Sequence, residues 1–158
     1  MLLRTTGRLE AVGVQPGRVS SEFGTRYLAT VSWATATTGA TFVLLPDQVY
    51  AVFGVMIYGT GGFPTAFGVE EAAYIRLTHN VMGALMAGWF AFIAWYVRNI
   101  LPRRVPGAWT SLALAFLLWF SLDTTYSALA GYWPNVFLNA GFLLAFAPGF
   151  WLTRSLRD

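Results

Sequence analysis

The sequence contains no cysteine and no lysine, and it has a single histidine among its 158 residues. The absence of cysteine excludes disulfides, iron–sulfur clusters and thiolate metal sites. One histidine cannot supply both axial ligands of a bis-histidine haem, nor the several imidazoles of a histidine-rich metal site. Function classes that depend on these side chains are therefore excluded at the outset.

Charge is also scarce. Charged residues make up 11% of the chain, whereas a soluble domain usually carries about a quarter. Hydrophobic residues make up 56%, and many of them gather in long uninterrupted runs. This combination is typical of a membrane protein that contacts the lipid bilayer directly, and it excludes disorder over most of the length.

Four windows with little or no charge are long enough to cross a hydrocarbon core of about 30 Å. They are residues 27–45, 73–97, 109–130 and 135–153. The first window is rich in threonine, whose hydroxyl can donate to a carbonyl one turn back. We predict an all-α fold: an integral membrane four-helix bundle over 27–153, preceded by a polar, arginine-containing tail (1–26) and followed by a short C-terminus (154–158).

The connections between these spans are of different kinds. Apolar residues at helical spacing over 46–58 predict a short helix lying in the outer membrane interface. The turn at 131–135 is tight, so the last two spans are expected to be antiparallel neighbours, with Asn135 capping the fourth helix.

All ten basic residues are arginine, and their distribution predicts the orientation in the membrane. Nine lie on one side of the predicted spans, and the two opposite connections contain none. The nine are Arg4, Arg8, Arg18, Arg26, Arg98, Arg103, Arg104, Arg154 and Arg157. By the positive-inside rule both termini face the cytoplasm. The basic character therefore reflects membrane orientation, and nucleic acid is not an expected partner.

Polar residues gather at one depth, in the outer third of three spans. The candidate ligand-binding residues are Arg76, His79, Asn80, Asp123, Tyr126 and Asn139. A carboxylate within a span needs a cation beside it, and within the spans only Arg76 and His79 can supply one. We therefore expect Asp123 to pair with Arg76 or His79. One interpretation is a polar lock that fixes helix register without chemistry.

Two other interpretations give this cluster a ligand. In the first, it binds a polar-headed hydrophobic molecule such as a quinone, with Asn139 and His79 donating to a carbonyl and Trp119 or Tyr126 lining the tail region. In the second, His79 is the axial ligand of a (bacterio)chlorophyll magnesium. No catalytic set and no metal-binding pair accompanies these residues, so we expect neither an enzyme nor a metal site.

Two features predict protein partners. Small residues repeat on adjacent faces of the second span, as Gly83 with Ala87 and Ala84 with Gly88, and such stripes allow close helix contact. The tail 1–26 is a second candidate contact. Both favour association with other membrane subunits.

A further set of residues marks a resemblance to a known group. The set comprises Tyr74, Arg76, His79, Asn80, Trp119, Asp123, Gly131, Trp133, Pro134 and Asn135. Over about residues 27–153 the chain resembles small bacterial four-helix membrane proteins related loosely to the DoxX-like superfamily. This resemblance implies the bacterial inner membrane and a quinone-linked accessory role.

The expected function is that of a non-catalytic accessory or structural subunit of a larger membrane complex of respiratory or photosynthetic type. The alternative is a DoxX-like redox partner that binds a quinone or another small hydrophobic ligand through the outer polar cluster.

Overall fold

The computed structural model describes residues 16–59 and 67–157, and within these ranges the chain is helical with no strand. The predicted all-α class is confirmed. The long elements are α1 (Pro16–Leu44), α2 (Pro46–Tyr58), α3 (Val69–Asn99), α4 (Ala108–Leu129) and α5 (Trp133–Thr153). Two short 3₁₀ helices, η1 (Leu101–Arg103) and η2 (Arg154–Leu156), follow α3 and α5.

Helices α3, α4 and α5 are each long and apolar enough to cross a membrane. A fourth crossing requires α1 and α2 together, as Ser20–Leu44 and Pro46–Tyr58 bent by 105° at the break. Three or four spans are therefore possible by length and composition. The predicted window 27–45 is helical, but it reaches the apolarity of a span only with α2, because its threonines dilute it.

Those threonines bond within the helix as expected. The hydroxyls of Thr35, Thr37 and Thr38 donate to the carbonyls four residues earlier, at 2.9–3.1 Å. The chain thereby removes the cost of placing these hydroxyls in an apolar setting. Helix α1 also begins at Pro16, so residues 16–26 of the predicted tail belong to it, and residues 1–15 lie outside the described part.

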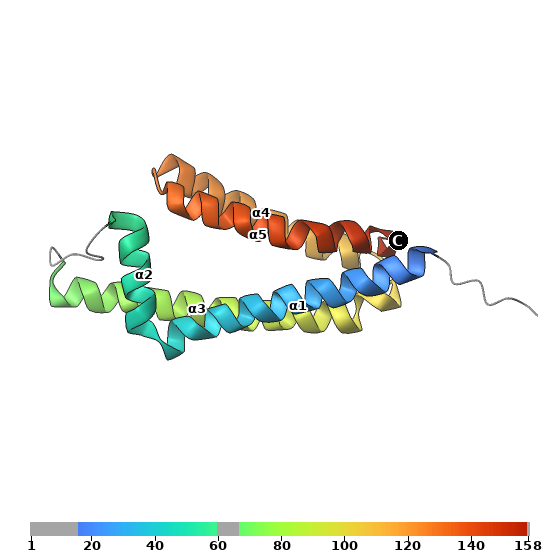
Figure 1. Ribbon diagram of the computed structural model, residues 1–158, viewed down its shortest axis with the longest axis horizontal. Helices are drawn as coiled ribbons and strands as arrows, with labels where there is room; N and C mark the ends of the chain where they lie inside the picture. Colours follow the sequence, from blue (N-terminus) through green and yellow to red (C-terminus); the bar gives the residue numbers. More distant parts are fainter. Residues whose placement is uncertain (1–15, 60–66, 158) are drawn as a thin grey trace, which may run out of the picture.

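The helices form two layers. Helices α1 and α3 lie side by side along most of their length, and the α4–α5 hairpin lies over them (Figure 1). The layers meet at the end where the chain terminates, through contacts of α1 with α5, and they diverge toward the end that carries α2. The prediction was a four-helix bundle; the described helices form a wedge of two layers that separate at one end.

Glycine allows the close contact between α1 and α3. A Cβ at Gly83 would lie 2.2 Å from the Cβ of Phe42 and 2.6 Å from the carbonyl oxygen of Gly39. A Cβ at Gly39 would in turn lie 2.6 Å from the backbone nitrogen of Ala87. Because these distances leave no room for a side chain, the two backbones approach as small-residue stripes permit.

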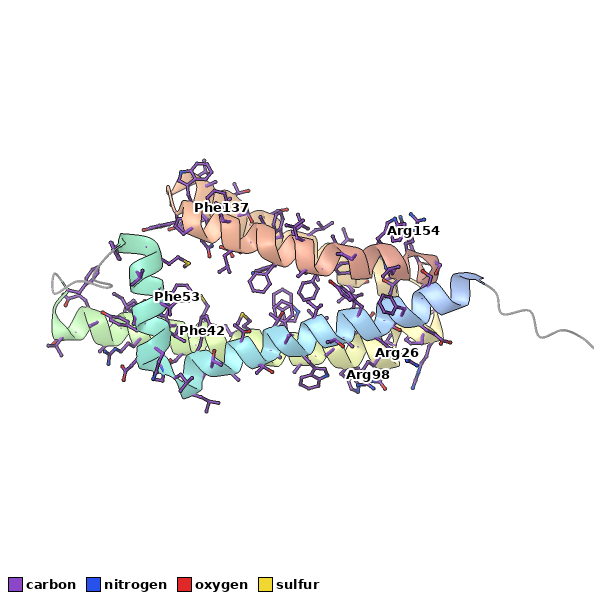
Figure 2. The ribbon with its side chains drawn as sticks, viewed as in Figure 1. Arg26, Phe42, Phe53, Arg98, Phe137 and Arg154 are labelled. Atoms are coloured by element: carbon purple, nitrogen blue, oxygen red, sulfur yellow. The ribbon has the colours of Figure 1, made fainter. Side chains whose placement is uncertain are left out.

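The closed end of the wedge contains the hydrophobic core. The buried side chains there include Leu28 of α1, Phe90 and Val97 of α3, Phe116 of α4 and Phe146 of α5. Rings from three helices contact one another, with centroids 5.5 Å apart for Phe90 and Phe146 and 5.0 Å for Phe116 and Phe146. This core holds the layers together at the end that is rich in arginine, where Figure 2 shows Arg26, Arg98 and Arg154.

The α4–α5 hairpin forms as predicted, but its cap does not. Gly131 adopts φ +79°, and Pro134 lies in the first turn of α5. The N-cap of α5 is Tyr132, and no side chain caps the helix. The prediction that Asn135 caps this helix is therefore wrong: Asn135 lies inside the first turn, and its amide bonds across to α4.

Candidate ligand-binding site

A cavity of about 310 Å³ lies in the wedge, between α3 on one side and α4 and α5 on the other. Its volume is at the lower end of the range of small-molecule pockets. Carbon atoms form most of its wall, and the carboxylate and amide side chains that the described residues contribute come from α4 and α5. An apolar cavity with convergent polar groups is the usual form of a ligand site.

Aromatic rings form the part of the cavity nearest the core. The rings of Trp89 on α3 and Trp119 on α4 meet edge to face, with centroids 6.5 Å apart. Trp119 also meets Phe142 of α5 edge to face at 5.8 Å. These contacts close the narrow end of the wedge and present ring faces and edges to the cavity. Trp119 lines the cavity, as predicted for the tail region of a ligand.

Helix α2 borders the wide end. The ring of Phe53 on α2 lies 5.5 Å from the ring of Phe42 at the end of α1, and both rings line the cavity. Phe53 also lies 4.8 Å from the imidazole of His79 on α3. Figure 2 shows Phe42 and Phe53 at this end, facing the α4–α5 hairpin that carries Phe137. The bend between α1 and α2 therefore positions one aromatic wall of the cavity.

The polar part of the cavity is a hydrogen-bonded cluster between α4 and α5. The amide nitrogen of Asn135 donates to Asp123 Oδ1 at 3.0 Å and to Ser127 Oγ at 2.8 Å. The Ser127 hydroxyl donates to the same carboxylate oxygen at 3.3 Å. Asn139, which is 1% exposed, donates to Thr124 Oγ1 at 3.2 Å. Asp123, Asn135 and Asn139 line the cavity and are held in place by these bonds.

The expected pairing of Asp123 with Arg76 or His79 is wrong. Arg76 Nη1 lies 3.0 Å from Asp47 Oδ1, and its guanidinium lies 4.8 Å from the centre of the Tyr50 ring. Asp47 and Tyr50 are one turn apart on α2, which the bend at Leu45 brings against α3. Arg76 therefore links α3 to α2, and its ion pair is with Asp47 and not with Asp123.

The structure brings together only part of the predicted cluster. Asp123 and Asn139 share the cavity, whereas Arg76 and Asn80 line a separate shallow hollow along α3. Tyr126 is exposed on α4 and does not line the cavity. His79 is buried behind the Phe53 ring, so a magnesium macrocycle on this imidazole would have to displace that ring.

The small-residue faces of α3 have different surroundings. The face formed by Gly83 and Ala87 contacts α1 of the same chain, through Gly39 and Phe42. On the second face Ala84 is exposed, and a Cβ at Gly88 would meet nothing within 4 Å.

Sequence reasoning did not identify several residues of the cavity. Asn135 was interpreted as a cap, and Met82, Met86 and Trp89 were not considered as ligand contacts. Their spacing carries a signal, because residues at i, i+4 and i+7 share one face of a helix. Asn135, Asn139 and Phe142 repeat the same spacing on α5, and both faces line the cavity.

In the part of the chain that the structure describes, no group of three or more His, Asp or Glu side chains is arranged to hold a metal ion. Comparisons with protein-family models, curated proteins and solved structures give no match to this chain. The resemblance to DoxX-like proteins therefore stays a prediction that depends on the residues quoted for it.

Proposed function

We propose that the chain is a non-catalytic membrane protein that binds a small lipophilic molecule in the cavity of the wedge. The observation that supports this most directly is the placement of Asp123, Asn135 and Asn139 at one side of an otherwise aromatic and aliphatic cavity. A molecule with an apolar body and a polar head matches this division. A quinone is one member of the class, as the DoxX-like resemblance suggests.

Hydrogen bonds between α4 and α5 hold the polar cluster in place. Three amide and hydroxyl donors hold the side chains of Asp123 and Asn139 in one arrangement. A site whose polar groups are fixed in advance loses less entropy when a ligand binds. The proposal therefore gives the cluster two roles, joining α4 to α5 and orienting the head of the ligand.

The proposal also includes an orientation in the membrane. We place the α2 end of the wedge, and hence the cavity, in the outer leaflet of a bacterial inner membrane, with both termini in the cytoplasm. The arginine-rich closed end supports this orientation, because positive charge favours the cytoplasmic side. A ligand would then enter from the lipid through the wide side of the wedge.

Saturable photolabelling tests the proposal. The full chain in lipid nanodiscs is irradiated with a neutral aromatic diazirine, with and without excess triphenylphosphine oxide, and adducts are located by mass spectrometry. We expect the competitor to suppress adducts on cavity residues such as Met86 and Trp89. Adducts on the exposed Leu118 and Leu144, which lie outside the cavity, should persist. Equal persistence at both sets would contradict a binding cavity.

A second candidate function is that of an accessory subunit in a larger membrane complex. The open face of Ala84 and Gly88 favours it, since such a face allows close contact with another helix. Native gel migration after gentle solubilisation tests this candidate. Replacement of Gly88 by leucine should release the chain from a larger species, and migration of the unaltered chain alone would contradict assembly.

A further inference from the structure

The polar groups of the cavity offer more acceptors than donors. Asn135 donates from one amide nitrogen to two oxygens, which uses both of its N–H groups. Asn139 uses one N–H on Thr124. The amide oxygens of both asparagines and the second oxygen of Asp123 accept no hydrogen bond within the described residues. A ligand head that donates hydrogen bonds or carries positive charge suits this set better than an acceptor such as a carbonyl.

Asp123 also has no cationic partner in the described part of the chain. The arginine at a similar level, Arg76, is held by Asp47 on the other side of the wedge. A carboxylate inside a membrane helix is costly unless another charge compensates it. Within the described residues Asp123 therefore has two hydrogen-bond donors, Asn135 and Ser127, but no cation beside it.

The remaining walls favour the same kind of ligand. Six aromatic side chains line the cavity: Phe42, Phe53, Trp89, Phe90, Trp119 and Phe142. The face of an aromatic ring attracts a cation, and this attraction is strongest where water is excluded. A cavity lined by one carboxyl group and several aromatic rings is accordingly complementary to a cation with an apolar body.

We infer that the cavity is selective for lipophilic cations, meaning molecules with one positive charge carried by an aromatic or aliphatic body. This inference rests on the proposed function and specifies the ligand class. Asp123 supplies the countercharge, Asn139 orients the head, and the aromatic rings contact the body. A neutral molecule of the same size would bind more weakly, because it leaves the carboxylate uncompensated.

A matched pair of ligands tests the charge preference. Methyltriphenylphosphonium and triphenylphosphine oxide have the same three rings, but only the first is charged, and the second has only an acceptor oxygen. Binding of each to the full chain in nanodiscs is measured by isothermal titration calorimetry, with empty nanodiscs as the blank. We expect the cation to bind at least about tenfold more tightly, which corresponds to a difference of about 1.4 kcal/mol in binding free energy.

Two variants assign the preference to its residue. Asp123→Asn keeps an acceptor oxygen for Asn135 but removes the charge, and it should abolish the difference between the two ligands. Glu70→Gln removes one charge from an exposed position outside the cavity and should leave the difference unchanged. If Asp123→Asn does not fold, the ratio measured on the unaltered chain still decides the inference.

The outcomes separate the inference from the proposed function. Equal saturable binding of both ligands overturns the cation preference and leaves the binding cavity in place. Binding of neither ligand overturns both. Retention of the full preference in Asp123→Asn overturns the role of Asp123, and tight competition by a short-chain quinone against the cation would assign the cavity to an acceptor-headed ligand.

Discussion

The amide of Asn135 on α5 donates to the carboxylate of Asp123 on α4 at 3.0 Å, and this bond joins the two helices at the polar side of the cavity. Asn135 also donates to the hydroxyl of Ser127 at 2.8 Å, so this one side chain of α5 bonds to two residues of α4. The same contact therefore joins the hairpin and orients the Asp123 carboxylate at the wall of the cavity.

Replacement of Asn135 by alanine should lower the stability of the chain. It removes two interhelical hydrogen bonds, each worth about 0.6–1.7 kcal/mol in a membrane protein. We expect a lower midpoint of thermal unfolding in detergent, followed by circular dichroism. Thr125→Ala provides the control, because Thr125 lies exposed on the neighbouring helix α4 and its side chain has no hydrogen bond to a described residue. Equal midpoints for the two variants would show that the Asn135 bonds contribute nothing.

The two small-residue faces of α3 should respond in opposite ways to added bulk. Gly83→Ala places a Cβ against Phe42 and Gly39 at distances below 3 Å, so α1 and α3 must separate. We expect a strong loss of folded protein on size-exclusion chromatography. Gly88→Ala meets nothing, and it should be neutral or stabilising by up to about 1 kcal/mol through helix propensity. Similar losses in both variants would contradict the packing of α1 on Gly83.

The Arg76–Asp47 pair should hold α2 against α3. Both side chains are partly exposed, so the neutral variant Arg76→Gln should change little, since exposed pairs contribute about 0–1 kcal/mol. Arg76→Asp adds repulsion and should loosen α2, and the exchange Asp47→Arg with Arg76→Asp should restore the contact. Because the sequence has no cysteine, a single cysteine introduced as Met56→Cys reports on α2 through its rate of maleimide labelling.

The expected labelling rate rises by about two- to fivefold in Arg76→Asp and returns to its original value in the exchanged pair. Glu70→Gln on the first turn of α3 is the control and should leave the rate unaltered. A rate that stays raised in the exchanged pair would show that the contact between Arg76 and Asp47 does not hold α2.

Composition and periodicity predict the elements of this fold better than their arrangement. The helices, the hairpin at Gly131 and the threonine hydrogen bonds depend on local sequence, and all are present as expected. The partner of Arg76 depends on the 105° bend between α1 and α2, which no local pattern specifies. The depth of Arg76 in the membrane was inferred from the boundaries of the predicted spans. Depth alone does not show which neighbouring helix the side chain faces.

The candidate site shows the same limit. Asp123 and Asn139 were recognised because polar groups in an apolar span are unusual. Met86 and Trp89 were not, since apolar residues in such a helix are ordinary until the neighbouring helix is known to diverge. The buried aromatic side chains of α3, α4 and α5 gather at the closed end of the wedge. The sequence alone does not show this, because it requires the three helices to be placed against one another.

We have proposed that the cavity between α3 and the α4–α5 hairpin binds a lipophilic molecule, and filling the cavity with a larger side chain is the decisive test. Met86→Trp adds a ring inside the cavity, and Leu118→Trp adds the same ring on the exposed face of α4. The saturable part of the diazirine labelling is measured on both variants in nanodiscs. We expect Met86→Trp to abolish the saturable labelling and Leu118→Trp to retain it. Full saturable labelling of Met86→Trp would show that the ligand does not bind in this cavity.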